Sequence, residues 1–201
     1  MTKDWIEKII AVAKSRNPRD YLLMRLFATK GFRRGEIVGS EARHWNIETR
    51  KWERSEPTLP GLLVQDLRDN GIFVKGKGWK KTVNPNPPEF VTLSPELVKA
   101  LRDYIGNRKI GRIFPMDPSR PWQILRELAK IAGHPDWNRL HPHRIRHFGG
   151  TTAYEIEGKD LRAANSFLRH KSMASTFRYI MKQTPEEKAK LSDKMEKLIS
   201  V

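Results

Sequence analysis

The sequence contains no cysteine, so neither disulfide bonds nor thiolate metal sites can stabilise its fold. It has no run of about 18 apolar residues, which excludes a membrane-spanning helix. Its first residues also lack the basic and then apolar pattern of a signal peptide. We therefore expect a cytoplasmic protein without a membrane partner.

Acidic residues are scarce relative to basic ones. The 201 residues include 39 Lys+Arg against 23 Asp+Glu, which gives a formal net charge of +16. Such an excess favours a polyanionic partner, most simply nucleic acid, with a membrane surface as the rival. The sequence also lacks a cluster of carboxylates, which argues against two-metal phosphoryl chemistry.

Apolar periodicity and capping residues predict a mainly α (α+β) fold with a small antiparallel β-sheet. The expected helices span about 4–15, 19–30, 95–105, 121–132, 143–157, 160–168, 172–182 and 186–200. A turn at Asp69–Gly71 and short strands at 72–75 and 90–93 provide the sheet. Residues 41–60 hint at two strands around a turn at 48–51 but have no clear assignment.

Four residues near the C-terminal end form a polar set, namely His143, Arg146, His170 and Tyr179. Buried polar groups each need a partner, so this set makes little sense as a core. It suits a phosphate site, because arginine donors match phosphate oxygens and histidine can donate a hydrogen bond or a proton. A phenol oxygen can in addition attack phosphorus and form a covalent product.

Phosphodiester cleavage needs a nucleophile, neutralisation of the phosphate oxygens and a proton for the leaving alkoxide. Tyr179 is the candidate nucleophile, and its free pKa of about 10 means that it needs nearby cations or a base. Arg33, which lies three residues before Glu36, would bind the phosphate together with Arg146. A lysine of residues 75–81 would protonate the leaving 5′ oxygen. We therefore expect no metal and no other cofactor.

These residues resemble the active site of the tyrosine recombinases, the phage integrase family. The matching motifs are Gly-x-Arg-x-x-Glu at Gly31–Glu36, Gly-Lys-Gly at Gly76–Gly78 and His-x-x-Arg-His at His143–His147. The family's Leu-Gly-His corresponds to Leu-Arg-His at Leu168–His170. Tyr179 follows at the family's usual distance. The similarity runs from about Arg19 to Ile180, and order, spacing and residue type agree together.

The resemblance implies a function and a role for each matched residue. The catalytic set is Arg33, Lys77, His143, Arg146, His170 and Tyr179, supported by Glu36 and His147. The expected DNA-binding residues are Lys75, Lys80, Lys81, Arg144 and Arg169. Lys77 is the preferred general acid because glycines flank it, while the other lysines of 75–81 stay as alternatives.

By this resemblance the protein is a site-specific DNA recombinase or integrase. It would cut and rejoin double-stranded DNA through a 3′-phosphotyrosyl intermediate, without metal or ATP, at the nucleoid or on host-cell DNA. Two alternatives stay open. One is a DNA-relaxing activity like that of type IB topoisomerases, and the other is a DNA-binding module with a vestigial site.

The chain also departs from the family pattern. Arg169 replaces the usual glycine, and residues 39–60 are longer than the usual link. The 201 residues have no counterpart of the family's separate N-terminal DNA-clamping domain, so we expect either an excised catalytic domain or a protein that works in a reduced form. We expect a catalytic domain at 1–184 and a C-terminal helix or tail at 185–201 that docks on its own domain or, in a DNA-bound assembly, on a neighbouring protomer.

Several other residues have simpler interpretations. His141, His143 and His147 could suggest zinc, but the arginines between them would repel a dication and no carboxylate completes the set. We expect His44 and His134 at the surface, and most tryptophans in the core.

Overall fold

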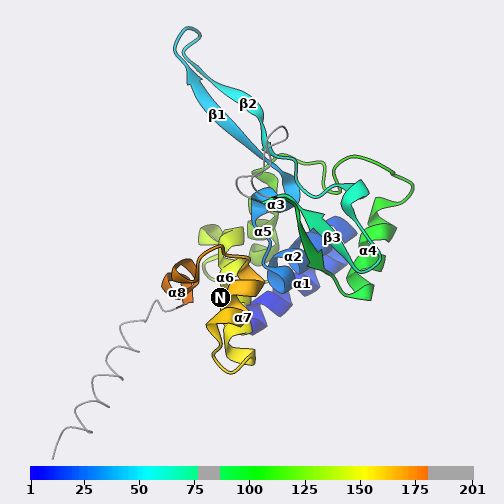
Figure 1. Cartoon of the computed structure of the whole chain (residues 1–201), viewed down its shortest axis with the longest axis vertical. Coiled ribbons are helices and arrows are strands. Elements are labelled where there is room, and N and C mark those ends of the chain that lie inside the picture. Colours follow the sequence, from blue (N-terminus) through cyan, green and yellow to red (C-terminus); the bar gives the residue numbers. More distant parts are fainter. Residues whose placement is uncertain (77–86, 181–201) are drawn as a thin grey trace, which may run out of the picture. The chain divides into compact units, whose positions relative to one another are not determined.

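The structure is a computed structural model, which describes residues 1–76 and 87–180 (Figure 1). Within that part, the side chains of residues 42–44, 52, 54–58, 178 and 179 are not described. The chain divides into two compact units, Met1–Gly149 and Gly150–Val201, each with its own internal contacts.

The first two helices, α1 (Lys3–Arg16) and α2 (Pro18–Lys30), meet at Asn17 and pack against each other. The Asn17 side chain accepts a hydrogen bond from the backbone N–H of Asp20 at 2.9 Å. Pro18 occupies the first position of α2, where its missing N–H is not needed. The helix boundary expected from the sequence is therefore confirmed.

A tight turn joins α2 to the short helix α3 (Arg34–Val38). Gly31 ends α2 with a φ of 54°, in the left-handed region that glycine adopts without strain. The buried Phe32 then anchors the turn in the core. Arg33 directly precedes α3, and Glu36 lies in its first turn. Arg33 and Glu36 therefore lie close together at the start of α3.

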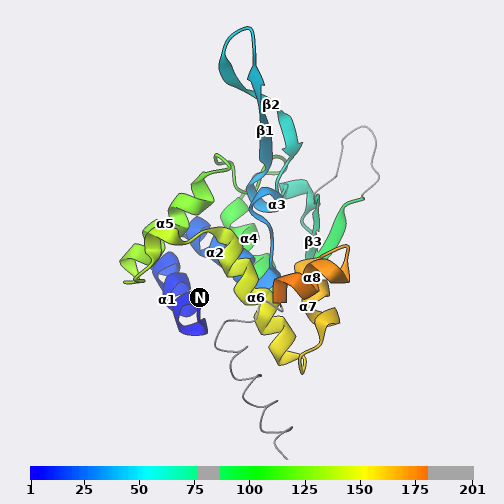
Figure 2. The same cartoon turned by 90° about the vertical axis from the view of Figure 1, so that its left-hand side faces the viewer.

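Strands β1 (Ser40–Asn46) and β2 (Lys51–Leu59) form an antiparallel hairpin that extends from the helices of its unit (Figures 1 and 2). The Asn46 side chain accepts hydrogen bonds from the backbone N–H groups of Glu48 at 2.9 Å and Thr49 at 3.2 Å. An asparagine that bonds the backbone in this way favours a turn. The two strands suggested by residues 41–60 are confirmed.

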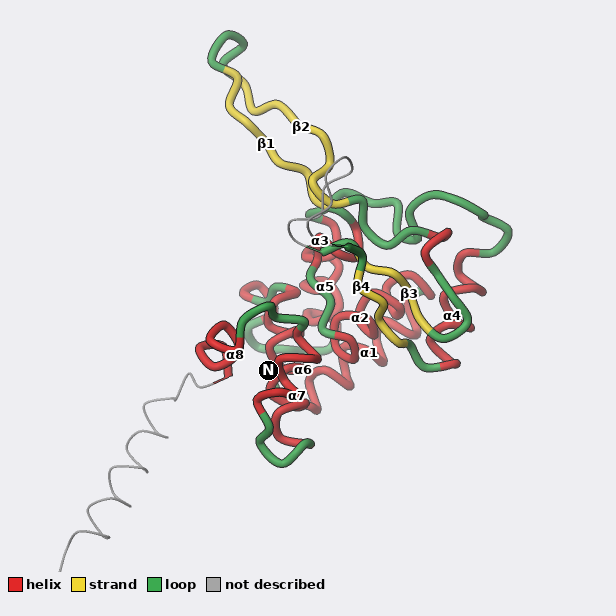
Figure 3. Tube along the Cα trace, viewed as in Figure 1, coloured by secondary structure: helices red, strands yellow, loops and turns green. Residues whose placement is uncertain are grey.

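A second sheet pairs β3 (Gly71–Val74) with β4 (Glu89–Thr92) in antiparallel fashion (Figure 3). Before β3, the backbone N–H of Arg68 donates to the carbonyl of Gly71 at 2.8 Å, which closes the expected turn. Both strands lie within one residue of their predicted positions. In the described part of the chain, the single expected sheet is instead two separate two-stranded sheets.

Helices α4 (Pro95–Ile105) and α5 (Arg120–Ile131) complete the first unit. Ser94 caps α4 by accepting a hydrogen bond from the N–H of Leu97 at 3.3 Å. Helix α4 packs on α2, and α5 packs on α1 and α2. The core between them includes Ile9, Leu22, Leu26, Phe27, Leu101, Ile124 and Leu128.

Helix α6 (Pro142–Ile156) crosses the boundary between the units, and the second unit also contains α7 (Leu161–Leu168) and α8 (Met173–Ile180). The Asp160 side chain caps α7 by accepting a hydrogen bond from the N–H of Arg162 at 2.7 Å. Helices α7 and α8 pack against each other. The predicted mainly helical fold is confirmed, while the predicted helix at 186–200 lies outside the described residues.

Two expectations about individual side chains are wrong. His134 is buried rather than at the surface, and its Nδ1 accepts a hydrogen bond from the N–H of Asp136 at 3.1 Å. Its ring centroid lies 4.7 Å from that of Trp5. The expectation for the tryptophans is not met among the described side chains: Trp45 and Trp122 are exposed, while Trp5 and Trp137 are only partly buried, with Trp137 packed against the core.

No described helix combines the length and the hydropathy that a bilayer crossing requires.

Candidate active site

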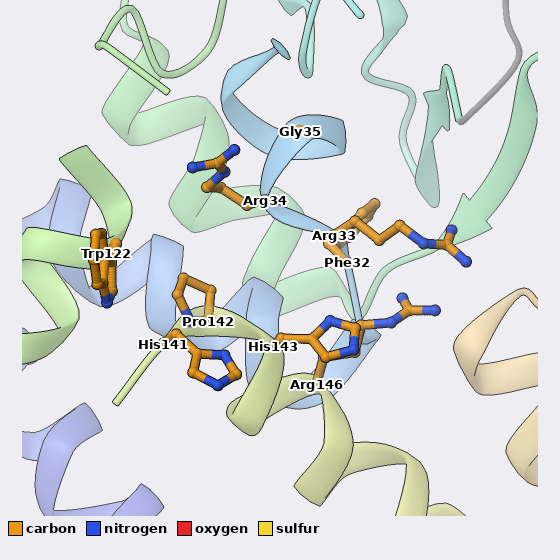
Figure 4. A pocket seen from close by; sticks show the side chains of 9 residues that line it. All are labelled: Phe32, Arg33, Arg34, Gly35, Trp122, His141, Pro142, His143 and Arg146. Atoms are coloured by element: carbon orange, nitrogen blue, oxygen red, sulfur yellow. The ribbon is translucent and has the colours of Figure 1, made fainter. Parts of the chain in front are cut away.

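A pocket of about 410 Å³ lies in the first unit, where the turn between α2 and α3 meets residues of α5 and the start of α6 (Figure 4). Its described lining is basic and aromatic, with no acidic side chain. The lining residues are Phe32, Arg33, Arg34, Gly35, Trp122, His141, Pro142, His143 and Arg146. Such a lining suits an anion.

Glu36 orients Arg33 at the edge of this pocket. The Arg33 backbone N–H donates to Glu36 Oε2 at 2.7 Å, and its guanidinium Nη1 donates to Oε1 at 2.8 Å. The Glu36 side chain is only 2% exposed, whereas the Arg33 side chain is 35% exposed. Glu36 thus holds both the backbone and the guanidinium of Arg33, while part of the Arg33 side chain stays accessible. Arg33 and Glu36 therefore form an ion pair at the start of α3.

Arg146 is buried, with 1% of its surface exposed. Its Nη1 donates a hydrogen bond to the carbonyl oxygen of Gly31, so that α6 is tied to the end of α2. Figure 4 shows the guanidinium groups of Arg33 and Arg146 on the same side of the pocket, whereas Arg34 points to the other side. A buried charge is expensive unless it is paired, so packing alone does not account for an arginine here.

His143 lies beside Arg146 at the start of α6 (Figure 4). Its pKa is lowered first by loss of hydration and then by the positive charges of Arg146, His141, His147 and Arg33. A lowered pKa keeps the imidazole neutral at pH 7, because the usual value is about 6.5. A neutral ring has one nitrogen that can donate and one that can accept a proton.

Arg34, Trp122 and His141 also line the pocket, although none of the three was expected from the sequence to be a site residue. The His141 and His143 rings stack with centroids 6.3 Å apart. The Trp122 indole N–H donates to the carbonyl of Leu140 at 2.7 Å, which ties α5 to the start of α6. The close spacing of His141 and His143 was a usable signal, but no local pattern links Trp122 to them.

In the second unit, His170 directly follows the residue that ends α7. Its Nδ1 lies 2.9 Å from the hydroxyl of Thr176, a buried residue of α8. Tyr179 also belongs to α8, but its side chain is not described. The pocket therefore unites Arg33, His143 and Arg146, while His170 and Tyr179 lie in the other unit.

The lysines expected near the site are only partly described. Lys75 forms an ion pair with Asp66, and both side chains are largely buried. Lys77, Lys80 and Lys81 lie outside the described residues. The general acid and the DNA-binding lysines thus stay predictions.

The arginines expected to bind DNA differ in their settings. Arg144 is exposed on α6. Arg169 ends α7 with φ 48° and ψ 50°, in the left-handed region. That conformation explains why glycine is usual at this position, since a side chain is strained there. His147, the other expected supporting residue, is half-buried on α6.

In the described part of the chain, no group of three or more histidine or acidic side chains is arranged to hold a metal ion.

The sequence profile of the Phage integrase family matches residues 1–186. The chain belongs to this family. The resemblance of its motifs to those of the tyrosine recombinases is thereby confirmed.

Curated members of the phage integrase family give a consistent result. Tyrosine recombinase XerA of Pyrococcus furiosus is 25% identical over 181 residues, which is 88% of this chain and 54% of the relative. Tyrosine recombinase XerC of Staphylococcus carnosus is 31% identical over 169 residues, or 80% of this chain and 48% of the relative. This family member therefore spans about half the length of the curated relatives it matches.

Solved structures of phage integrase relatives share the fold. The structure of a XerA recombinase superposes with a TM-score of 0.64 at 23% sequence identity. The match covers 97% of this chain and 64% of the XerA chain. The structure of XerH bound to its difH substrate also has a TM-score of 0.64, at 18% sequence identity. The match covers 94% of this chain and 51% of the XerH chain. The catalytic domain of bacteriophage HP1 integrase matches 94% of this chain and 92% of its own, with a TM-score of 0.54 at 18% identity.

Proposed function

We propose that this chain is the catalytic part of a site-specific DNA recombinase or integrase that works through a 3′-phosphotyrosyl intermediate. One observation carries the proposal. Arg33 lines one pocket with His143 and Arg146, which lie more than 100 residues later, in a member of the phage integrase family. The named relatives support it, since they are tyrosine recombinases, and the Tn1549 transposon integrase is seen in complex with transposon right end DNA.

Each residue has a distinct part in the proposed reaction. Arg33 and Arg146 neutralise the non-bridging oxygens of the scissile phosphate. Tyr179 attacks the phosphorus and forms the 3′-phosphotyrosyl bond, while Lys77 protonates the 5′ oxygen as it leaves. His143, neutral at pH 7, hydrogen-bonds the phosphate. Attack by another 5′-hydroxyl then reverses the step, and the covalent bond conserves the energy, so neither ATP nor metal is needed.

The proposal extends to domains and partners. Residues 1–184 form the catalytic domain, and residues 185–201 form a tail that docks on a neighbouring protomer when the protein assembles on double-stranded DNA. The net charge of +16 supports the DNA partner, because Lys and Arg bind the phosphate backbone. The protein then acts in the cytoplasm, where bacterial or host-cell DNA is accessible.

A nicked suicide substrate tests the function, since it traps any covalent intermediate. We expect the wild-type protein and Tyr154→Phe, a matched control on α6, to form a covalent protein–DNA adduct. We expect Tyr179→Phe to form none, as judged by denaturing gel electrophoresis. An adduct that persists in Tyr179→Phe removes Tyr179 from this role. Relaxation of supercoils without exchange between two marked duplexes contradicts recombination.

A further inference from the structure

We propose that Asn165 and Thr176 are positioning residues that fix the tautomer of His170. In the neutral ring they place the proton on Nδ1, so that Nε2 carries the lone pair and serves as a proton acceptor. The catalytic use of this nitrogen rests on the proposed function, whereas the tautomer is a property of the free protein.

Four hydrogen bonds connect these residues within the second unit. The Asn165 amide Nδ2 donates to the backbone carbonyl of His170 at 3.1 Å. The Thr176 hydroxyl lies 2.6 Å from Asn165 Oδ1, to which it donates, and 2.9 Å from His170 Nδ1. The backbone N–H of His170 also donates to the carbonyl of Asn165 at 3.2 Å. Thr176 is fully buried, so no water replaces these partners.

The hydrogen bond between the Asn165 side chain and the His170 carbonyl determines the direction of the two side-chain bonds that follow it. A backbone carbonyl can only accept, so the Asn165 atom that faces the His170 carbonyl must be the amide nitrogen. The other atom, which faces Thr176, is then the oxygen, which also only accepts. Thr176 has a single hydroxyl proton and must donate it to that oxygen. The Nδ1 of His170 therefore has to donate to the lone pair of Thr176.

The reverse arrangement is unfavourable at two points. If Nδ1 accepted the Thr176 proton, two acceptors, the hydroxyl and the Asn165 oxygen, would face each other at 2.6 Å. Turning the Asn165 amide over would relieve that contact, but it would bring the amide oxygen against the His170 carbonyl at 3.1 Å. Buried polar atoms that lose their partners in this way are destabilising by about 1–3 kcal/mol each.

A ring with its proton on Nδ1 has one catalytic consequence. Nε2 can donate a hydrogen bond only after it has gained a proton. In the proposed cleavage step, the phenol O–H bond of Tyr179 breaks and an Nε2–H bond forms on His170. The phenolate oxygen attacks phosphorus, and the 5′ oxygen leaves with a proton from Lys77. The imidazolium then donates a charge-assisted hydrogen bond to a phosphate oxygen.

Nitrogen-15 NMR of the histidine rings tests the tautomer directly, with His170→Gln used to assign the signal. We expect the Nδ1–H form in the wild-type protein and in Thr176→Ser, which keeps the hydroxyl. We expect Thr176→Val to lose this preference. An Nε2–H form in the wild-type protein overturns the proposal, and the tautomer itself is read in the wild-type protein.

Cleavage kinetics give a second readout. Thr176→Val should slow single-turnover adduct formation by about 10- to 100-fold, as with other groups that orient a functional histidine. The acid side of its pH–rate profile should move to lower pH, because the imidazolium has lost an acceptor, and Thr176→Ser should restore both. An unmoved profile overturns the proposal. The Nδ1–H form without any adduct rejects the proposed function alone, whereas an adduct with the Nε2–H form rejects only this inference.

Discussion

Arg146 combines two tasks at one position. It is buried and bonds the carbonyl of Gly31, while its guanidinium also lines the pocket beside His143. A guanidinium can do both because its donors form a rigid, planar fork. Lysine retains the charge but not the fork, so replacement by lysine separates charge from geometry.

We expect Arg146→Lys to reduce single-turnover adduct formation by about 100-fold or more, similar to loss of one preorganised donor to a transition state. Adduct formation at saturating enzyme is the measurement. Arg139→Lys is the matched control, because this exposed arginine lies outside the pocket. Equal rates for the two variants would show that charge alone is sufficient at position 146.

Arg169 has a backbone conformation that favours glycine, with a φ of 48°. We expect Arg169→Gly to increase the free energy of unfolding by about 0.5–1 kcal/mol, since relief of left-handed strain exceeds the entropy lost by glycine. Arg169→Ala is the matched control, because it also removes the guanidinium but keeps the strain. Urea denaturation measures the free energies of unfolding of Arg169→Gly and Arg169→Ala.

DNA binding separates the backbone effect at position 169 from a phosphate contact. If Arg169 contacts a phosphate, both variants should weaken binding equally and reduce the slope of log K against log salt by about 1. Unequal losses of affinity would contradict a simple phosphate contact.

At the level of elements, local capping explains why most boundaries were predictable. Asn17, Ser94 and Asp160 each accept a backbone hydrogen bond at a helix start, so the signal lies within a few residues. The β1–β2 hairpin was harder to assign, because strand pairing depends on residues far apart in sequence. Its position outside the helices of its unit suggests a test of stability.

We expect replacement of residues 41–58 by a short turn to change the free energy of unfolding of the first unit by less than about 1 kcal/mol. The reason is that β1 and β2 contact mainly each other, and β1 otherwise packs on α3. Ser40 and Leu59 stay in place to keep the base of the hairpin. Urea denaturation is the measurement, and a large loss of stability would show that the hairpin supports the core.

At the level of the whole molecule, histidines couple stability to pH. Burial lowers the pKa of His134, and loss of hydration followed by nearby cations lowers those of His141 and His143. The unfolded chain therefore takes up protons at a higher pH than the folded protein. Stability is fully present above the unfolded pKa of about 6.5 and decreases as the pH falls towards the folded pKa values.

We expect the melting temperature to fall between pH 7 and pH 5, and to fall less in His134→Asn. The asparagine oxygen can accept the hydrogen bond from the Asp136 N–H without titrating. His141 and His143 should contribute less than His134, because solvent screens exposed groups. Calorimetry across this range is the measurement, and parallel curves for the two proteins would exclude His134 as the cause.

The sequence by itself determined most of the described helix limits, the fold class, the basic character and the family, because caps, periodicity, charge and motif spacing are local or additive properties. Only the tertiary structure decided that Arg146 is buried against Gly31, that His134 is in the core, and that Arg34, Trp122 and His141 join the pocket. The orientation of His170 by Asn165 and Thr176 is of the same kind. The burial of Arg146 and His134 and the place of Trp122 in the pocket depend on contacts between segments that no local pattern links, since burial and proximity arise when helices pack.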